Sequence, residues 1–268
     1  MGAMLQSLWS MKLPILVYHN VGPTVVGAWP ALTVSPEQFE LQMTWLAEHG
    51  YAGIRASDLL AWRREGQFRL PKPVMITFDD AYANIGEHAL PLLRHLGLTA
   101  TVYVVTARIG ATSVWDEAKG LTTLRLMSAE QISYWAGEGI EFGAHGRTHV
   151  NLTTLSGSRL AEEIGGSADD LAALLGVRTM SFAYPYGAHA LGVRQCVQRL
   201  VDMALTCESG LNGLRTDQFM LHRTAIQPSD DMPAFANRVR LGKLPSEHLR
   251  HRVRALFKGR HVSVATAS

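Results

Sequence analysis

Short runs of apolar residues alternate along the chain with longer segments in which apolar residues recur every three or four positions. The short runs predict strands at residues 14–18, 73–78, 99–105, 140–144, 179–185, 203–207 and 219–226. The longer segments predict helices at residues 35–50, up to Leu96, at 128–139 and 158–175, and from about Leu191. Strands separated by helices of this length indicate βαβ units and a parallel sheet.

Two of the predicted helices carry clear start signals. Ser35 is followed by Pro36 and, three residues on, by Gln38, which is the pattern of a capping box with proline in the first helical turn. Ser128 and Gln131 repeat the capping-box spacing.

No repeat or Pro/Gly-rich linker divides the 268 residues, so we expect one α/β domain over residues 1–268. With about seven strand–helix units, a closed or nearly closed barrel is favoured over an open sheet. In such a barrel the chemistry lies at the carboxyl ends of the strands.

Polar residues stand at several of these predicted strand ends. They are His19, the pair Asp79 and Asp80, the pair His145 and His149, the segment 185–187 (PYG), and His222. Because parallel strands end at one rim of a barrel, we expect these residues to lie close together.

The spacing of His145 and His149, four residues apart, is common among metal ligands. With one aspartate from another strand end they make a two-histidine, one-carboxylate set that leaves positions open for water and substrate. The second aspartate of the pair is then free to act as a general base. The alternative is that Asp79 and Asp80 merely cap the helix that follows.

Three segments, TFDD (77–80), HGRTH (145–149) and FAYPYG (182–187), resemble in order the first motifs of the polysaccharide deacetylase family, the NodB-homology or carbohydrate esterase 4 enzymes. The resemblance covers about residues 13–240. It implies a distorted (β/α)7 barrel, usually a Zn²⁺ ion, and removal of acetyl groups from N-acetylated sugars.

The resemblance also implies roles for individual residues. Asp79 matches the catalytic base, and the metal ligands match Asp80, His145 and His149. Tyr186 matches the residue whose backbone N–H stabilises the oxyanion.

The chain departs from the family pattern in two places. Ala183 stands where an arginine usually pairs with the catalytic base. The histidine motif expected near the C-terminus is unclear, whereas the chain begins with ILVYHNVG (15–22), which is similar to the circularly permuted subgroup that deacetylates poly-N-acetylglucosamine. This similarity favours His19 as general acid, with His222 as the competitor.

Further residues near the motifs are candidates for contacts with a sugar. We expect Tyr82 and Trp115 to offer aromatic surfaces, and Asp116 and Pro185 to contact the substrate. The alternative for the aromatic side chains is ordinary core packing.

The chain is close to neutral, with a formal charge of +2, so its overall charge does not indicate binding to nucleic acid. Eight Lys or Arg residues and one acid lie between Arg238 and His261, and they predict a basic helix at about 244–260. Such a helix fits peripheral contact with an anionic membrane and a lipid-linked sugar substrate, or simply docking on the barrel.

Cys196 and Cys207 are expected to be free thiols. With no leader pattern or apolar span, we expect a cytoplasmic location, at most peripheral to the inner membrane face.

Three other classes remain as alternatives to an N-deacetylase. One is another amide hydrolase on the same fold, of the cyclic-imide type. A catalytically inactive carbohydrate-binding homologue is the second, because of Ala183. A receiver domain also carries paired acids at a strand end, but it has no use for the two histidines.

Overall fold

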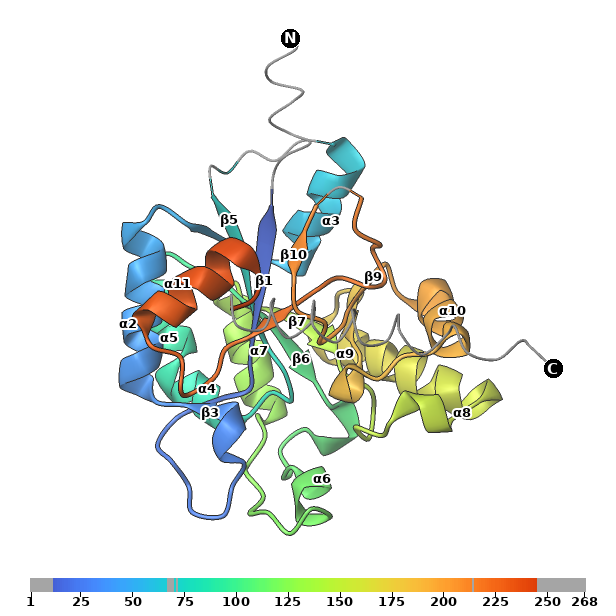
Figure 1. The fold of residues 1–268 in the computed structure, drawn as a ribbon. Coiled ribbons are helices and arrows are strands. Elements are labelled where there is room, and N and C mark those ends of the chain that lie inside the picture. The colour runs from blue at the N-terminus through green and yellow to red at the C-terminus, as the bar shows by residue number, and fades with distance from the viewer. Residues whose placement is uncertain (1–11, 67–69, 71, 214, 245–268) are drawn as a thin grey trace, which may run out of the picture.

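A curled parallel sheet forms the centre of the molecule in the computed structural model, which describes residues 12–66, 70, 72–213 and 215–244 (Figure 1). The strands are ordered β10-β1-β5-β6-β7-β8-β9. Their bounds are β1 Leu13–Tyr18, β5 Pro73–Phe78, β6 Thr101–Val104, β7 Glu141–Ala144, β8 Ser181–Ala183, β9 Met203–Leu205 and β10 Leu211–Asn212. All neighbouring pairs in this order are parallel except β1 with β10.

The segment from Leu221 to Ala225 connects the two ends of this sheet. Leu221 forms a parallel bridge with Leu205 of β9, and β11 (Thr224–Ala225) pairs in parallel with β1. The sheet is therefore curled into the distorted (β/α) barrel that the sequence predicts. The expected strand at 219–226 is regular only at β11, because the chain crosses from one strand to the other within it.

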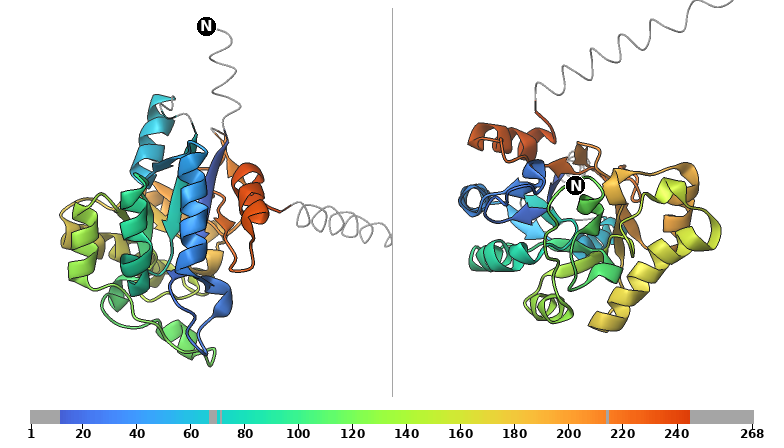
Figure 2. Two further views of the ribbon diagram at one scale, coloured as in Figure 1. Left: turned by 90° about the vertical axis from the view of Figure 1, so that its left-hand side faces the viewer. Right: turned by 90° about the horizontal axis from the view of Figure 1, so that it is seen from below.

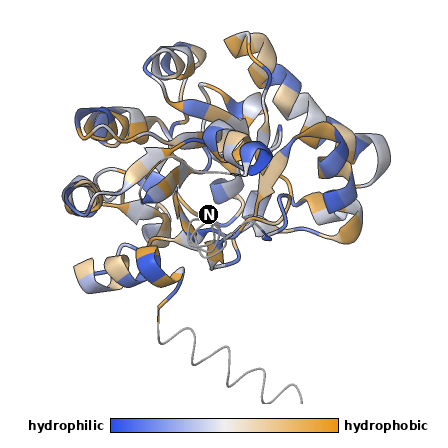
Figure 3. Ribbon diagram, turned by 90° about the horizontal axis from the view of Figure 1, so that it is seen from above, coloured by the Kyte–Doolittle hydropathy of each residue, from blue (hydrophilic) through white to orange (hydrophobic). Residues whose placement is uncertain are grey.

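Helices cover the outside of the sheet, and the views from below and above show them as a ring around the strands (Figures 2 and 3). The helices are α2 Pro36–Glu48, α3 Ala56–Glu65, α4 Ala83–His88, α5 Leu90–His95, α6 Val114–Glu117, α7 Ala129–Gly137, α8 Gly157–Ala161, α9 Ser167–Leu175, α10 Leu191–Leu200 and α11 Met232–Leu241. Short elements complete the fold: β2 Asn20–Val21, β3 Thr33–Val34, β4 Ala52–Ile54, and the 3-10 turns η1 Pro30–Leu32, η2 Thr106–Arg108, η3 Leu152–Thr154 and η5 Pro185–Gly187.

The predicted helix starts are largely confirmed. The Ser35 hydroxyl accepts the Gln38 N–H at 3.2 Å, and Ser128 and Gln131 form both halves of a capping box. The Gln38 side chain is different from the expectation, because its amide donates to the Asp230 carbonyl instead of to the helix start.

Two helices predicted as continuous are interrupted. The segment up to Leu96 divides into α4 and α5, with a proline in the first turn of α5. The segment 158–175 contains a π-helical turn, η4 (Glu162–Gly166), between α8 and α9. Elements β4, α3 and α11 were not predicted at all.

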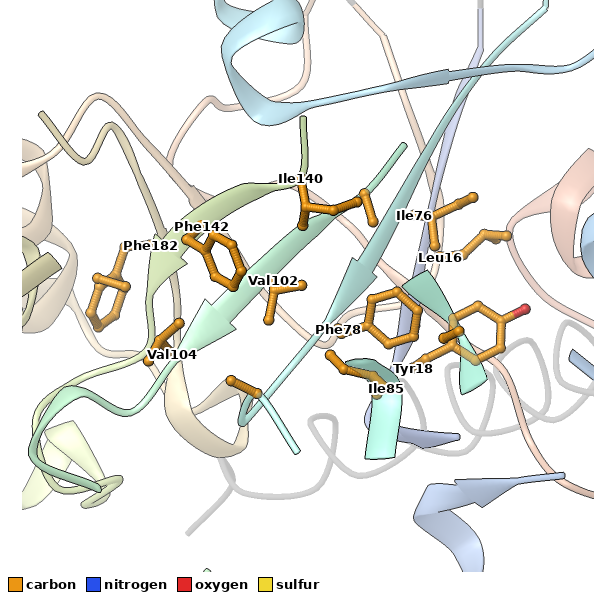
Figure 4. Packing of buried hydrophobic residues seen from close by; sticks show 14 of the residues in the cluster. Leu16, Tyr18, Ile76, Phe78, Ile85, Val102, Val104, Ile140, Phe142 and Phe182 are labelled. Atoms are coloured by element: carbon orange, nitrogen blue, oxygen red, sulfur yellow. The ribbon is translucent and has the colours of Figure 1, made fainter. Parts of the chain in front are cut away.

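Alternation along the strands separates two cores. Outward-facing residues pack under the helices, among them Leu16, Tyr18, Ile76, Phe78, Val102, Val104, Phe142 and Phe182 (Figure 4). Inward-facing residues fill the barrel, among them Leu13, Ile15, Met75, Tyr103, Ala183, Met203, Leu205 and Leu221. This alternation decides which of the residues at the strand ends face the barrel interior.

Several expectations concern features outside the sheet. No helix among the described residues is long and apolar enough to cross a membrane. Cys196 and Cys207 are both free. The basic helix expected at about 244–260 lies beyond Leu244, outside the described residues.

Candidate active site

The carboxyl ends of β1, β5, β7 and β8 bring polar residues to one rim of the barrel. His19 follows β1, Asp79 and Asp80 follow β5, His145 and His149 follow β7, and Tyr186 lies in η5 after β8. These residues therefore lie close together at the ends of their strands, as expected from the sequence.

The two adjacent aspartates reach the same site through an unusual backbone. Residues 75, 77 and 79 face the barrel interior, so simple alternation would turn Asp80 outward. Instead Asp80 and Ala81 adopt left-handed conformations, with φ of 69° and 55°. The other non-glycine residues with positive φ in the described chain are His149 (61°) and Tyr186 (59°). Strained backbone of this kind is typical of functional sites.

Asp80, His145 and His149 form a buried group that could hold a metal ion, with one donor atom from each residue all within 4.8 Å of one another. The Asp80 Oδ1 atom lies 3.2 Å from His149 Nε2 and 3.5 Å from His145 Nε2. This oxygen is buried and has no hydrogen-bond partner. A buried acceptor that faces two imidazole nitrogens is suited to a divalent cation.

The protonation states of the two histidines also fit metal ligation. Burial lowers the pKa of both imidazoles, so they are neutral. His145 Nδ1 lies 2.8 Å from the Ala183 carbonyl oxygen. In the tautomer with the proton on Nδ1, the ring donates to this carbonyl and Nε2 keeps a free lone pair. This contact fixes the tautomer that presents Nε2 to the group.

The ionised form of Asp80 is disfavoured in this arrangement. Burial raises the pKa of its carboxyl well above the usual value, and the neighbouring Asp79 raises it further. A cation bound at this point would reverse both effects. The donor set thus fits a divalent transition metal such as Zn²⁺.

Asp79 is paired with Arg223, a contact absent from the expectations drawn from the sequence. Arg223 donates to both carboxylate oxygens, at 2.6 Å and 2.7 Å, and both side chains are buried. Burial alone raises the pKa of Asp79, but the guanidinium outweighs it and holds that pKa below the usual range. The carboxylate is therefore ionised and fixed in orientation.

Arg223 occupies the barrel interior in which the Ala183 side chain also lies. Its Nε donates to the Thr206 carbonyl at 2.9 Å, and its guanidinium lies 5.7 Å from the centre of the Tyr103 ring. Ala183 stands where the family pattern has an arginine. Arg223, from a different segment of the barrel, provides the guanidinium that pairs with Asp79 here. Leu221 faces the barrel interior, and side chains two residues apart on an extended segment point the same way. This alternation is the signal that could have placed Arg223 inside the barrel.

The two candidate general acids lie in different surroundings. His19 is close enough to Asp79, Arg223 and His145 for their charges to affect it, and burial lowers its pKa to about 4. His222 follows Leu221 on the opposite side from Arg223, and its Nδ1 lies 3.8 Å from Glu208. The structure brings His19, and not His222, together with the aspartates.

The residues expected to contact sugar are mostly covered. Tyr82 is 2% exposed, and its hydroxyl donates to the buried Asp116 carboxylate at 3.3 Å. Trp115 packs in the same small core and lies 4.3 Å from the His149 ring. Pro185 is also buried. Because these side chains are buried, they offer little surface for direct contact with a sugar, whereas Tyr186 is 47% exposed beside His149.

The loop between the two histidines is held by the carboxylate of Glu163 in the π-helical turn. One Glu163 oxygen accepts the N–H groups of Arg147 (2.9 Å) and Thr148 (3.0 Å), and the other accepts the Thr148 hydroxyl at 2.6 Å. Arg147 in turn binds Asp170 through two hydrogen bonds. These contacts fix the backbone that presents His149.

Comparison with known proteins identifies the family and the fold. Residues 69–201 match the family model described as polysaccharide deacetylase. YxkH of Bacillus subtilis, which is named as a polysaccharide deacetylase, is 26% identical to this chain over 225 residues. These residues are 84% of this chain and 75% of YxkH. A poly-beta-1,6-N-acetyl-D-glucosamine N-deacetylase of Staphylococcus aureus is 27% identical over 165 residues, but the match spans only 54% of that protein and 58% of this chain.

Solved structures share the fold. The Streptococcus pyogenes deacetylase PplD, solved with acetate, has a TM-score of 0.75 and 22% identity, covering 87% of this chain and 99% of that one. IcaB from Ammonifex degensii has a TM-score of 0.69 and 22% identity, covering 87% and 97%. The chain therefore carries a polysaccharide deacetylase domain of the NodB-homology type, built on a (β/α) barrel.

Proposed function

We propose that the chain is a metal-dependent N-deacetylase that acts on an N-acetylated amino-sugar polysaccharide or glycoconjugate and releases acetate. The observation that carries the proposal is the buried group Asp80, His145 and His149, with its unpartnered oxygen, directly beside an Asp79 carboxylate held by Arg223. The similarity to proteins named for poly-N-acetylglucosamine deacetylation supports this substrate class.

Asp80, His145 and His149 would hold the metal. When bound, a Zn²⁺ ion supplies Lewis-acid polarisation of an amide carbonyl and increases the acidity of water.

The chain's own residues then divide the proton transfers. Asp79 accepts a proton from the attacking water, and Arg223 keeps its oxygens aimed at the site. The Tyr186 N–H donates to the oxyanion, a contribution of about 3 kcal/mol for a well-placed donor.

His19 protonates the leaving amine, so that acetate and a free amino sugar are formed. Its pKa of about 4 means that it is neutral in the free protein at neutral pH. It must therefore take up a proton from solvent during turnover before it protonates the amine, and Asp79 returns the proton of the attacking water to solvent afterwards. Negative charge that develops on the reacting amide favours the protonated imidazole.

The test is acetate release from short N-acetylglucosamine oligomers, measured before and after chelation and after Zn²⁺ is restored. We expect activity to disappear with the chelator and to return with the metal. Asp79→Asn should abolish release while it retains bound metal, because Asp79 is outside the donor group. Full activity of Asp79→Asn would refute the assignment of the base, and hydrolysis of a cyclic imide in place of the sugar amide would refute the substrate class.

A further inference from the structure

An exposed cation lies beside the candidate active site, on a loop that the roles assigned above do not use. Lys119 follows α6, and its Nζ atom lies 4.5 Å from the centre of the Trp29 ring and 5.1 Å from that of the Tyr186 ring. The Tyr186 ring lies in turn 4.5 Å from the ring of His149. Lys119 and the two aromatic side chains therefore form a continuous wall that leads outward from the metal group.

Three separate loops build this wall. Trp29 precedes η1 and is 36% exposed, Lys119 belongs to the loop after β6, and Tyr186 belongs to η5 after β8. The first two loops are joined by Thr122, which donates from its N–H to the Gly27 carbonyl (2.8 Å) and from its hydroxyl to the Val26 carbonyl (3.1 Å). Their relative position is thus fixed by hydrogen bonds and does not depend on the lysine alone.

Lys119 belongs to no ion pair in the part of the chain that the structure describes. Its ammonium lies instead over the faces of the two rings. Two acids precede Lys119 closely in the sequence. Glu117 is exposed and belongs to none of the ion pairs found among the described residues, and Asp116 turns its carboxylate into the interior, toward the Tyr82 hydroxyl.

We propose that Trp29, Lys119 and Tyr186 form a subsite for the sugar next to the one that is hydrolysed, and that this subsite selects a neutral N-acetylated residue over one with a free amine. The proposal rests on the N-deacetylase function proposed above. Aromatic faces suit the apolar face of a sugar ring, and the ammonium can donate to hydroxyl or acetamido oxygens. A free amino sugar is itself cationic at neutral pH, so it meets a like charge at this wall.

The consequence is a spacing rule for the product. Once one sugar has lost its acetyl group, its neighbour binds less well, because the new ammonium must lie against Lys119. The enzyme then leaves acetylated residues between deacetylated ones. Since the effect is electrostatic and partly exposed, added salt weakens it.

The test compares binding of a fully acetylated N-acetylglucosamine pentamer with that of the fully deacetylated glucosamine pentamer to the metal-free full-length protein. We expect wild type to prefer the acetylated chain by about threefold to tenfold at low salt. Lys119→Gln should remove most of the preference, and Lys119→Glu should reverse it. Trp29→Ala should weaken binding of both chains.

Lys72 provides the matched control. It also lies over an aromatic ring, 5.8 Å from the centre of Tyr51, but it precedes β5 at the opposite end of the barrel. Lys72→Gln should keep the wild-type preference. An unchanged preference in both Lys119 variants, or no preference in wild type, would overturn the subsite. Acetate release by wild type in parallel samples reports separately on the proposed function, because the binding comparison needs neither metal nor turnover.

Discussion

Arg223 and Asp79 face each other as a fully buried bidentate pair inside the barrel, although 144 residues separate them in the sequence. The arginine comes from the segment that joins β9 to β1, and the aspartate comes from the end of β5. The contact therefore depends on closure of the sheet, and it couples the stability of the barrel to the orientation of the candidate base.

Arg223→Met should destabilise the protein by about 3–5 kcal/mol, because it leaves the Asp79 charge buried without a partner. Asp79→Asn combined with Arg223→Met should recover part of that loss, since no uncompensated charge then remains. Arg223→Lys keeps the charge but not the paired donors, so we expect a folded protein with much reduced acetate release. Urea unfolding and activity measurements check these outcomes. If Arg223→Met were as stable as wild type, the pair would have no structural role.

The raised pKa of Asp80 predicts how the metal-free protein responds to pH. Burial raises the folded-state pKa above the unfolded value of about 3.9, so stability from this group is complete below that value. It is lost as pH rises through the folded pKa, by at most about 1.4 kcal/mol per pH unit. Metal-free Asp80→Asn should therefore become increasingly more stable than wild type as pH rises.

Unfolding of both proteins across pH 4–8 measures this difference, with the exposed Asp169→Asn as a control. Saturating Zn²⁺ should reverse the order, because it stabilises wild type and has no complete donor group in Asp80→Asn. A constant difference between the two metal-free proteins at all pH values would contradict the assignment.

The sequence predicts the framework of the site better than its details. The buried strand at 73–78 is found at the predicted bounds, because its apolar run ends sharply at the two aspartates. Regular alternation could not predict that Asp80 turns inward, since this depends on a left-handed backbone that tertiary packing supports. Nor could it identify Arg223 as the partner of Asp79, because the pair forms only when distant strands close the barrel. Nor does alternation reveal the burial of Tyr82, because its neighbours Trp115 and Leu126 are distant from it in the sequence.

Glu163 is expected to act as a positioning residue for the metal group. Glu163→Ala removes the acceptor for the Arg147 and Thr148 N–H groups, so the loop that carries His149 loses its support. We expect metal affinity to fall by about tenfold to a hundredfold, as is typical when a partner behind the ligands is lost. Glu163→Gln retains an acceptor oxygen and should restore most of the affinity.

Glu162 is the matched control, because it is the neighbouring residue and, among the described residues, its ion pair is with the half-buried guanidinium of Arg147 and not with the backbone of the loop. Glu162→Ala should bind metal as wild type does. Equilibrium titration with Zn²⁺ against a competing chelator measures all three variants. Equal Zn²⁺ affinity of Glu163→Ala and Glu162→Ala would show that the contacts of Glu163 with the loop do not affect metal binding.

His19 and His222 can be separated by substitution and by choice of substrate. His19 lies among Asp79, Arg223 and His145, whereas His222 contacts Glu208 on the other side of its strand. His19→Gln should slow hydrolysis of N-acetylglucosamine oligomers by about 10²–10⁴-fold, the usual contribution of a general acid. The loss should be much smaller with 4-nitrophenyl acetate, because its leaving group departs without a proton. His222→Gln, a change of the same kind, should keep activity on both substrates within about threefold. A larger loss in His222→Gln than in His19→Gln on the sugar amide would transfer the role to His222, and equal losses on amide and ester would show that His19 does not protonate the leaving amine.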